Sequence, residues 1–429
     1  MIRIRLNNIL KIKHSPFQIR YILKMLVFML VLFNLSCKNS SNTNKQISAI
    51  DVSLNIERFD KLFASSNPTD LPSLKSKYPF LFSNKFSDSI WIDRMKDPIQ
   101  DLLNSAVDSV FNDFKTTESE IKLFYQHLKY YNKPISTPRV ITVLSDVDYR
   151  NKVIVTDTIV LIALDTYLGK DHEFYTSFYE YIKQNLTPTQ IVPDLASSYA
   201  EQFIYQPNRT TFLDQMIYFG KQLYLKDLWI PFKTNHEKIG YSDSEYKWSE
   251  SNEFYIWQYF IENELLYLTD RKLFDRFILS APFSQFNLEL DRESPGRIGQ
   301  YIGWQIVKSY MENNPTPYFE MIRMDPQNIF NNAKQYFLED SILALLPISS
   351  DTFSVVWSCN QKFYEELKNK DDVDFMIELN KIIGKDYGKI LNLSNRYNFP
   401  LSMVLNDKFF DQRIVLMGNA AHSIHPLAG

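Results

Sequence analysis

The spacing of apolar residues predicts helices along most of the chain. Apolar positions recur every three to four residues, the period of a helix with one buried face, in the ranges 57–63, 71–82, 91–114, 173–184, 188–204, 211–225, 245–268 and 296–313. The period changes to β-branched runs at 139–144, 152–156 and 158–163, which predict one small sheet. We therefore expect an α+β fold that is mostly helical and carries one short sheet.

The pattern shifts again near residue 337. Apolar runs at 342–347 and 352–357 predict two strands, and the spacing in 362–383 predicts an amphipathic helix. This shift divides the chain into four expected parts. They are a signal segment (1–37), a polar tether (38–49), a main domain (50–336) and a C-terminal segment (337–429).

The first 37 residues have the pattern of a secretory leader. A basic stretch without acidic residues is followed by the apolar run 25–33 and then by Asn34-Leu-Ser-Cys37. The run is too short to span a bilayer, and a small residue before Cys is typical of a lipoprotein cleavage site. We expect acyl chains on Cys37 to anchor the chain to a membrane. A plain signal peptide and a buried Cys are the alternatives. Residues 38–45 are so polar that they predict an unpacked tether.

Composition narrows the classes of function. The chain of 429 residues has 47 Lys and Arg against 50 Asp and Glu, a net charge of −3, which gives no reason to expect a nucleic-acid partner. A zinc-protease helix needs two His four residues apart. His172 and His236 are each followed by Glu, but Thr176 and Gly240 stand where the second His would be. We expect no metal site and no catalytic residue in the main domain.

Several strings in the main domain resemble a known family. They are TFLDQMIYFGK at 211–221, Asn252-Glu253 with Ile256-Trp257, APFSQF at 281–286 and ESPGRIGQYIGW at 293–304. Together with the leader and Cys37 they resemble the gliding-motility lipoprotein GldB of Bacteroidetes, over about residues 25–336. The resemblance implies a lipid-anchored, periplasm-facing protein of the cell envelope. It would support gliding and protein export through protein contacts, without a known catalytic residue.

The order of sheet and helices is also similar to predicted zinc-dependent proteases. In those proteins one helix carries the metal-binding His pair, but the corresponding helix here, about 195–203, has no His. The resemblance implies a zincin-like scaffold that has lost its metal. A degenerate protease that now binds peptides is therefore one further hypothesis.

One aromatic helix invites a catalytic interpretation. Glu250, Glu253, Glu262 and Glu264 on this helix suggest acid–base chemistry, but a solvated face with a few hydrogen-bonded partners explains them as well. Trp248, Trp257, Tyr259 and Phe260 have the spacing of core residues. Gly299 and Gly303, four residues apart, predict a smooth helix face for close packing rather than a phosphate-binding loop.

The C-terminal segment resembles a second family. An apolar strand runs into GNAAHSIHPLAG at 418–429, which looks like the second flavin motif of class A flavin monooxygenases, closest to the UbiH-like ubiquinone-biosynthesis hydroxylases. The resemblance implies FAD contacts at Gly418, Asn419, Pro426 and Gly429, within an incomplete α/β fragment. No GxGxxG exists among the ten glycines, so we expect FAD binding only if the fragment is completed.

The sequence thus leaves two main hypotheses. The first is a non-catalytic, lipid-anchored gliding-motility protein with a nonfunctional flavin-hydroxylase fragment. The alternative is an FAD-dependent monooxygenase of the ubiquinone-biosynthesis type, which rests on residues 337–429. A joined or truncated reading frame and a two-function fusion both explain how the two resemblances share one chain.

Overall fold

The computed structural model describes residues 38–132, 134–288, 291–333, 335–338, 341–347, 353–359, 361–387 and 390–396, followed by the two-residue strands β8 (Val404–Leu405), β9 (Phe410–Asp411), β10 (Ile414–Val415) and β11 (His422–Ser423). Cys37 and the four predicted FAD contacts Gly418, Asn419, Pro426 and Gly429 lie outside the described residues. Of the helices in the described ranges, none combines the length and the apolar character needed to cross a membrane.

A four-stranded sheet organises the first half of the main domain. Its order is β1 (Ile56–Arg58), β2 (Arg139–Val143), β4 (Ile159–Ala163) and β3 (Val153–Val155). β2 pairs in parallel with both β1 and β4, while β3 pairs antiparallel with β4. The three predicted strands are confirmed. The prediction of a helix from residue 57 is wrong at its start, because residues 56–58 pair with β2 as the strand β1. Helix α3 (Phe59–Ala64) begins directly after β1.

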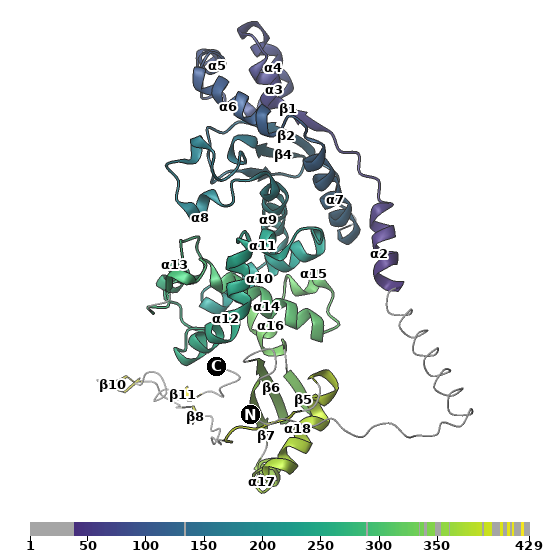
Figure 1. Cartoon of the computed structure of the whole chain (residues 1–429), viewed down its shortest axis with the longest axis vertical. Coiled ribbons are helices and arrows are strands. Elements are labelled where there is room, and N and C mark those ends of the chain that lie inside the picture. The colour runs from purple at the N-terminus through teal and green to yellow at the C-terminus, as the bar shows by residue number, and fades with distance from the viewer. Residues whose placement is uncertain are drawn as a thin grey trace, which may run out of the picture.

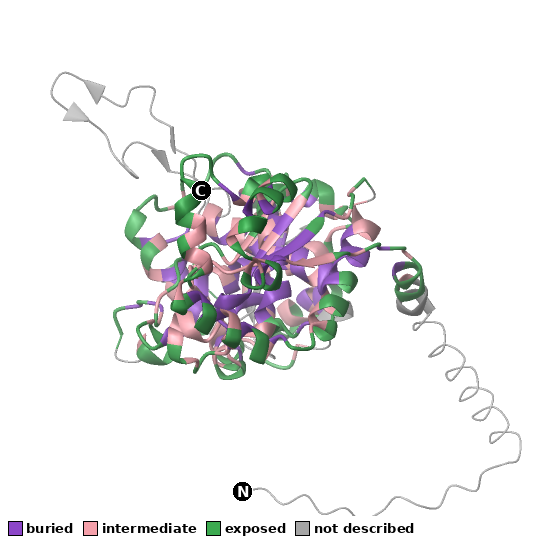
Figure 2. Cartoon of the chain, turned by 90° about the horizontal axis from the view of Figure 1, so that it is seen from above, coloured by how far each residue is buried: buried purple, intermediate pink, exposed green. Residues whose placement is uncertain are grey.

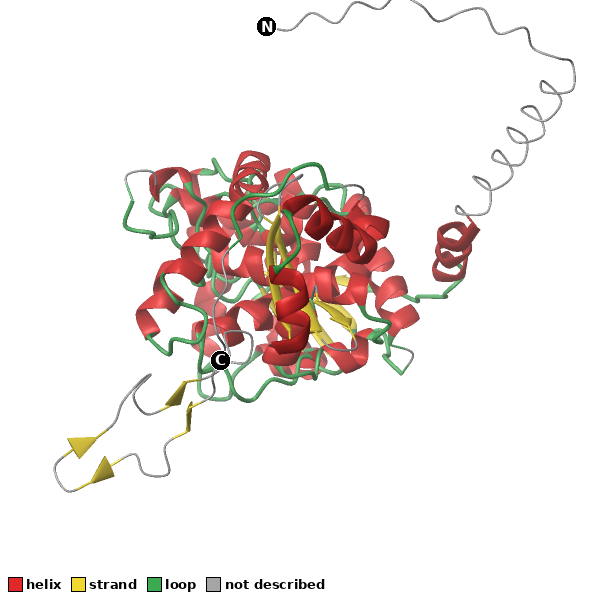
Figure 3. Cartoon of the chain, turned by 90° about the horizontal axis from the view of Figure 1, so that it is seen from below, coloured by secondary structure: helices red, strands yellow, loops and turns green. Residues whose placement is uncertain are grey.

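Helices lie above and below this sheet (Figure 1), and helices also surround the strands that are visible from below (Figure 3). Side chains alternate across each strand, so Val140 and Val160 join one apolar cluster while Ile141 belongs to another. The smaller cluster packs α3, α4 (Leu71–Lys77) and α5 (Asp88–Met95) against the sheet. The larger cluster packs α6 (Pro98–Val110), α7 (Lys115–Tyr131) and α9 (Ile191–Phe203) against the other face.

The larger cluster continues into a helical half (Figure 1). Its helices are α10 (Phe212–Trp229), α11 (Asn235–Ile239), α12 (Asp243–Glu262), α13 (Arg271–Phe277), α14 (Ile298–Asn313), α15 (Tyr318–Met321) and α16 (Pro326–Asn332). Seen from above, Figure 2 shows buried residues gathered in the middle of the folded part of the chain. The predicted helices at 188–204, 211–225, 245–268 and 296–313 are confirmed as α9, α10, α12 and α14.

Further predictions from the pattern differ from the structure. The helix predicted at 71–82 ends at Lys77 as α4, and the one predicted at 91–114 is divided into α5 and α6. The predicted helix at 173–184 is two short pieces, the 3₁₀ turn Glu173–Tyr175 and α8 (Glu180–Lys183). The predicted tether is helical as α2 (Lys38–Ser48), and its end packs on α7 through the buried Ile47. The mostly polar α2 is held in place because its apolar residue Ile47 is buried where α2 contacts α7.

The described part of residues 337–429 has a small core of its own. β5 (Gln335–Leu338), β6 (Ser341–Pro347) and β7 (Phe353–Cys359) form an antiparallel sheet, followed by α17 (Gln361–Lys368) and α18 (Asp372–Tyr387). Leu343, Leu379 and Ile383 are buried between this sheet and α18. The two predicted strands are confirmed as β6 and β7, and the predicted helix at 362–383 is divided into α17 and α18.

Candidate functional site

Helix α9 occupies the position in which the resemblance to proteases expects a metal-binding helix. The structure does not bring His172 and His236 into a ligand set: His172 begins the turn before α8 and stacks on Phe174, while His236 lies in α11. Throughout the described ranges, no group of three or more His, Cys, Asp or Glu is placed to hold a metal ion.

A charged network lies at α9 instead. Asp194 of α9 accepts a hydrogen bond from the Tyr167 hydroxyl at 2.8 Å and pairs with the Lys152 ammonium at 2.5 Å. The Lys152 ammonium also lies 5.3 Å from the centre of the Tyr167 ring. A carboxylate held by two partners connects β3 and the sheet edge to α9. This arrangement favours a structural role for Asp194 over acid–base catalysis.

Lys226 of α10 is a buried cation close to Asp194. Its ammonium donates to the carbonyl oxygen of Lys238 at 2.7 Å, and its side chain is nearly inaccessible to water. Burial lowers the pKa of Lys226 to about 8, an effect that the charge of Asp194 partly opposes. Sequence reasoning missed this lysine, because its position in an aromatic-rich helix gives no sign that its head group is buried.

Asp227 joins three helices next to Lys226. Its two oxygens accept from the Lys238 ammonium and from the Trp304 indole N–H, both at 2.8 Å. The Lys308 ammonium lies 3.7 Å from the centre of the Trp304 ring. α10, α11 and α14 are thereby linked by charge-assisted hydrogen bonds.

The acidic residues on and after α12 that the structure describes lie in different surroundings. Glu253 accepts a hydrogen bond from the buried Tyr301 hydroxyl at 2.9 Å, and burial raises the pKa of Tyr301. Glu250 and Glu264 are exposed, and the side chain of Glu262 lies outside the described residues. Phe260 is fully buried, whereas Trp248, Trp257 and Tyr259 are half-buried against the same core. The prediction of a core face is confirmed, and Glu253 holds α12 to α14.

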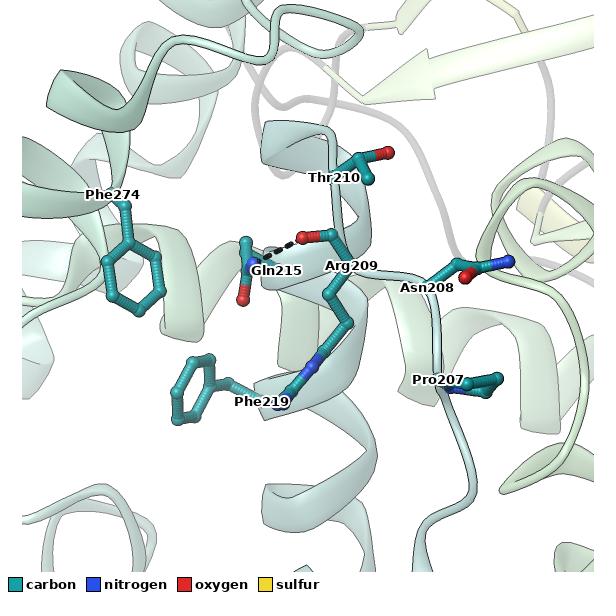
Figure 4. A pocket seen from close by; sticks show the side chains of 7 residues that line it. All are labelled: Pro207, Asn208, Arg209, Thr210, Gln215, Phe219 and Phe274. Atoms are coloured by element: carbon teal, nitrogen blue, oxygen red, sulfur yellow. Dashed lines mark hydrogen bonds between the residues drawn. The ribbon is translucent and has the colours of Figure 1, made fainter.

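A groove opens where the loop after α9 enters α10 (Figure 4). It has a volume of about 420 Å³ and is lined by Pro207, Asn208, Arg209, Thr210, Gln215, Phe219 and Phe274. A second hollow of about 250 Å³ continues it along residues 268–271 at the start of α13. We call the two hollows together the α10–α13 groove.

Local hydrogen bonds fix the walls of the α10–α13 groove. Thr211 caps α10, with its side chain accepting from the Asp214 N–H while Asp214 accepts from the Thr211 N–H. Gln215 donates to the Arg209 carbonyl at 2.8 Å, and the Arg209 guanidinium lies 4.0 Å from the centre of the Tyr218 ring. The wall is therefore held in place without a ligand.

The lining of the α10–α13 groove combines cations with aromatic rings. Arg209 and Arg271 supply two positive charges against the one negative charge of Asp270, and Phe219 and Phe274 supply apolar surface. Such a mixture suits an extended peptide with acidic and apolar side chains. Sequence reasoning missed these residues. The available signal was Asn208-Arg209-Thr210, a polar loop directly before the capping pair of α10.

Comparisons with known proteins find relatives of the hydroxylase type and, separately, a family model for the main domain. Ubiquinone hydroxylase UbiL of Rhodospirillum rubrum is 29% identical over 97 residues, covering 23% of each chain. Ubiquinone biosynthesis monooxygenase COQ6 of Danio rerio is 29% identical over 132 residues, covering 23% of this chain and 27% of its own. An uncharacterized protein of Synechocystis, slr1300, is 29% identical over 127 residues, covering 30% of this chain and 29% of its own.

The match to these curated relatives is partial. This chain spans less than a third of the length of each of the three. The similarity to UbiL and COQ6 is consistent with a fragment of the hydroxylase type in this chain. No solved structure matches the chain. The family model described as gliding motility protein GldB matches residues 40–336, well over half of the chain, which therefore belongs to the GldB family.

Proposed function

We propose that this chain is a periplasm-facing lipoprotein, anchored by acyl chains on Cys37, that supports gliding motility and protein export by holding protein partners. Its membership of the GldB family, a non-catalytic family of gliding-motility lipoproteins, carries the proposal. The mutual pairing of Asp194, Lys152 and Tyr167 supports a scaffold, because these groups already bind one another.

The α10–α13 groove is the proposed contact surface for a partner protein. Its arginines would pair with acidic side chains, while Phe219 and Phe274 would bury apolar ones. If the chain is a former protease that now binds peptides, the α10–α13 groove is our candidate for the peptide site.

The anchor is tested by labelling cells with palmitate. Label on the full-length chain that disappears in Cys37→Ala is the expected result. Absence of label, or label that persists in Cys37→Ala, contradicts the anchor. The control is Cys359→Ser, which removes the second cysteine and leaves the label in place.

The groove is tested in gliding cells that lack their own copy of the gene. Arg209→Glu reverses the charge of the lining, and we expect loss of gliding with normal protein level and normal palmitate label. Lys247→Glu is the matched control, because Lys247 is exposed on α12 and forms an ion pair with Asp243 of its own helix. Gliding by Arg209→Glu at the wild-type rate would exclude the groove as the contact surface.

An FAD-dependent monooxygenase is the second candidate, favoured by the similarity to UbiL and COQ6. Gly418, Asn419, Pro426 and Gly429 would contact the flavin. In the sequence, Asn360 alone stands between β7 and α17, so this strand–helix junction lacks the glycines that approach a pyrophosphate in the dinucleotide-binding motif. Flavin absorbance in the purified chain after addition of FAD would favour this candidate.

A further inference from the structure

Helix α2 connects the proposed lipid anchor directly to the folded body. Lys38, its first residue, follows Cys37. At the other end of α2, Gln126 of α7 donates to the carbonyl oxygens of Ser48 and Ile50, at 3.3 and 3.0 Å. A helix held in this way transmits the position of the anchor to α7, which a flexible tether would not do.

The length of α2 limits the distance between the anchor and α7. The Tyr130 hydroxyl, at the end of α7, donates to Gln46 at 3.2 Å. Eight residues separate Gln46 from Lys38, which is about 12 Å along a helix. Acyl chains on Cys37 would therefore hold the end of α7 within about 14 Å of the anchored residue, which is roughly the depth of two headgroup layers.

A chain of four aromatic rings lies at this end of α7, and we call it the aromatic edge. Ring centres are 5.1 Å apart for Tyr130 and Tyr131, 5.9 Å for Tyr131 and Tyr318, and 5.9 Å for Tyr318 and Phe319. The last ring belongs to α15, and 54% of Phe319 is exposed. Figure 1 shows α2, the end of α7 and α15 at the same level of the molecule.

The chemistry of the aromatic edge suits the boundary between lipid and water. The Tyr318 hydroxyl donates to the Asn132 side chain at 2.7 Å, so that its polar atom is satisfied within the protein. Tyr and Phe rings in such a place favour the headgroup level of a bilayer. Lys45 and Lys129, in the last turns of α2 and α7, add positive charge for anionic lipids, against the single acid Glu320 in α15.

We propose that the aromatic edge rests on the phospholipid surface that holds the acyl chains of Cys37. The anchored body then has one fixed orientation, with Phe319 inserted among the headgroups. This inference depends on the lipid anchor of the proposed function. It adds a second contact with the bilayer, made by α7 and α15.

Spin labels on the full-length lipidated chain test this contact. The label replaces Phe319 in the variant Phe319→Cys, on a Cys359→Ser background, in vesicles of phosphatidylethanolamine and phosphatidylglycerol. Collision rates with oxygen and with a water-soluble nickel chelate report the surroundings of the label. Tyr179→Cys is the matched control, since Tyr179 is 71% exposed and precedes α8, on the other side of the body from α2 in Figure 1.

We expect the ratio of oxygen to nickel collisions at position 319 to be at least threefold higher than at position 179. Tyr130→Cys serves as a second reporter and should show an intermediate ratio. Equal ratios at 319 and 179, in a chain that floats with the vesicles, would overturn the aromatic edge and leave the anchor intact. A chain that fails to float would overturn the anchor, and the inference with it.

Discussion

Gly303 of α14 lies against the main chain of Met216 in α10, where a Cβ on Gly303 would stand only 1.8 Å from the Met216 carbonyl oxygen. Gly220 makes the reciprocal approach: its Cβ would stand 2.2 Å from the carbonyl oxygen of Gly303. The two helices meet backbone to backbone at this crossing. Because α10 also forms a wall of the α10–α13 groove, the crossing fixes that wall relative to the rest of the core.

Replacement of Gly303 by Ala should destabilise the protein strongly. The new methyl group would collide with backbone atoms that cannot turn aside, so α10 and α14 would have to separate. Overpacking in a core costs about 1–3 kcal/mol, and we expect a loss near or above the upper end. Urea unfolding followed by tryptophan fluorescence measures it. Glu312→Ala, an exposed change on the same helix, should leave the unfolding midpoint nearly unchanged.

Buried Lys226 should make stability depend on pH. Its pKa is lowered to about 8 in the folded chain, from the ordinary value of 10.5. The unfolded chain therefore binds more protons between these values, and the free energy of unfolding should rise with pH through this window. Between pH 8 and 9.5 the contribution of Lys226 is at most about 2 kcal/mol.

The variant Lys226→Met isolates this contribution. We expect its free energy of unfolding to rise less steeply between pH 8 and 9.5 than that of the wild type. Lys221 is buried as well, with its pKa also lowered to about 8, so part of the rise should remain. Lys247→Met removes an exposed lysine and should keep the wild-type slope. Identical slopes for Lys226→Met and wild type would show that the Lys226 amine reaches water.

The capping pair of α10 should contribute to both stability and groove shape. Thr211→Ala removes the oxygen that accepts from the Asp214 N–H, and the loss of such a cap costs about 1 kcal/mol. Thermal unfolding measures the cost, and faster hydrogen exchange at residues 210–214 would locate it. Thr211→Ser keeps the hydroxyl and should behave like the wild type. An equal loss in both variants would assign the effect to the Thr methyl group.

Removal of residues 337–429 should leave the unfolding of the main domain unchanged. The buried residues Leu343, Leu379 and Ile383 form a cluster that shares no member with the two clusters of residues 52–333. A chain that ends at residue 336 should therefore unfold at the same urea concentration as the longer chain. A lower midpoint in the shorter chain would mean that the two parts form one cooperative unit.

Prediction from the sequence succeeds where local pattern and final environment agree. The strand at 158–163 is rich in β-branched residues and becomes the buried β4, and the helical spacing in 296–313 becomes α14. It fails where a partner distant in sequence decides the outcome. The polar residues 38–48 become a docked helix because α7 offers hydrogen bonds to its end. Residues 56–58 become a strand because β2 lies beside them.

The candidate site shows the same division. The absence of a metal-binding His pair and the close-packing face of Gly299 and Gly303 follow from the order of the residues, because both depend on spacing along one helix. The sequence also determined the family and the α+β class. Only the tertiary structure decided that Lys226 is buried beside Asp194, and that Arg209 and Phe274 line one groove. The burial of one side chain, and the meeting of two side chains from different helices, depend on how those helices pack. The pattern of residues within a single helix does not contain that information.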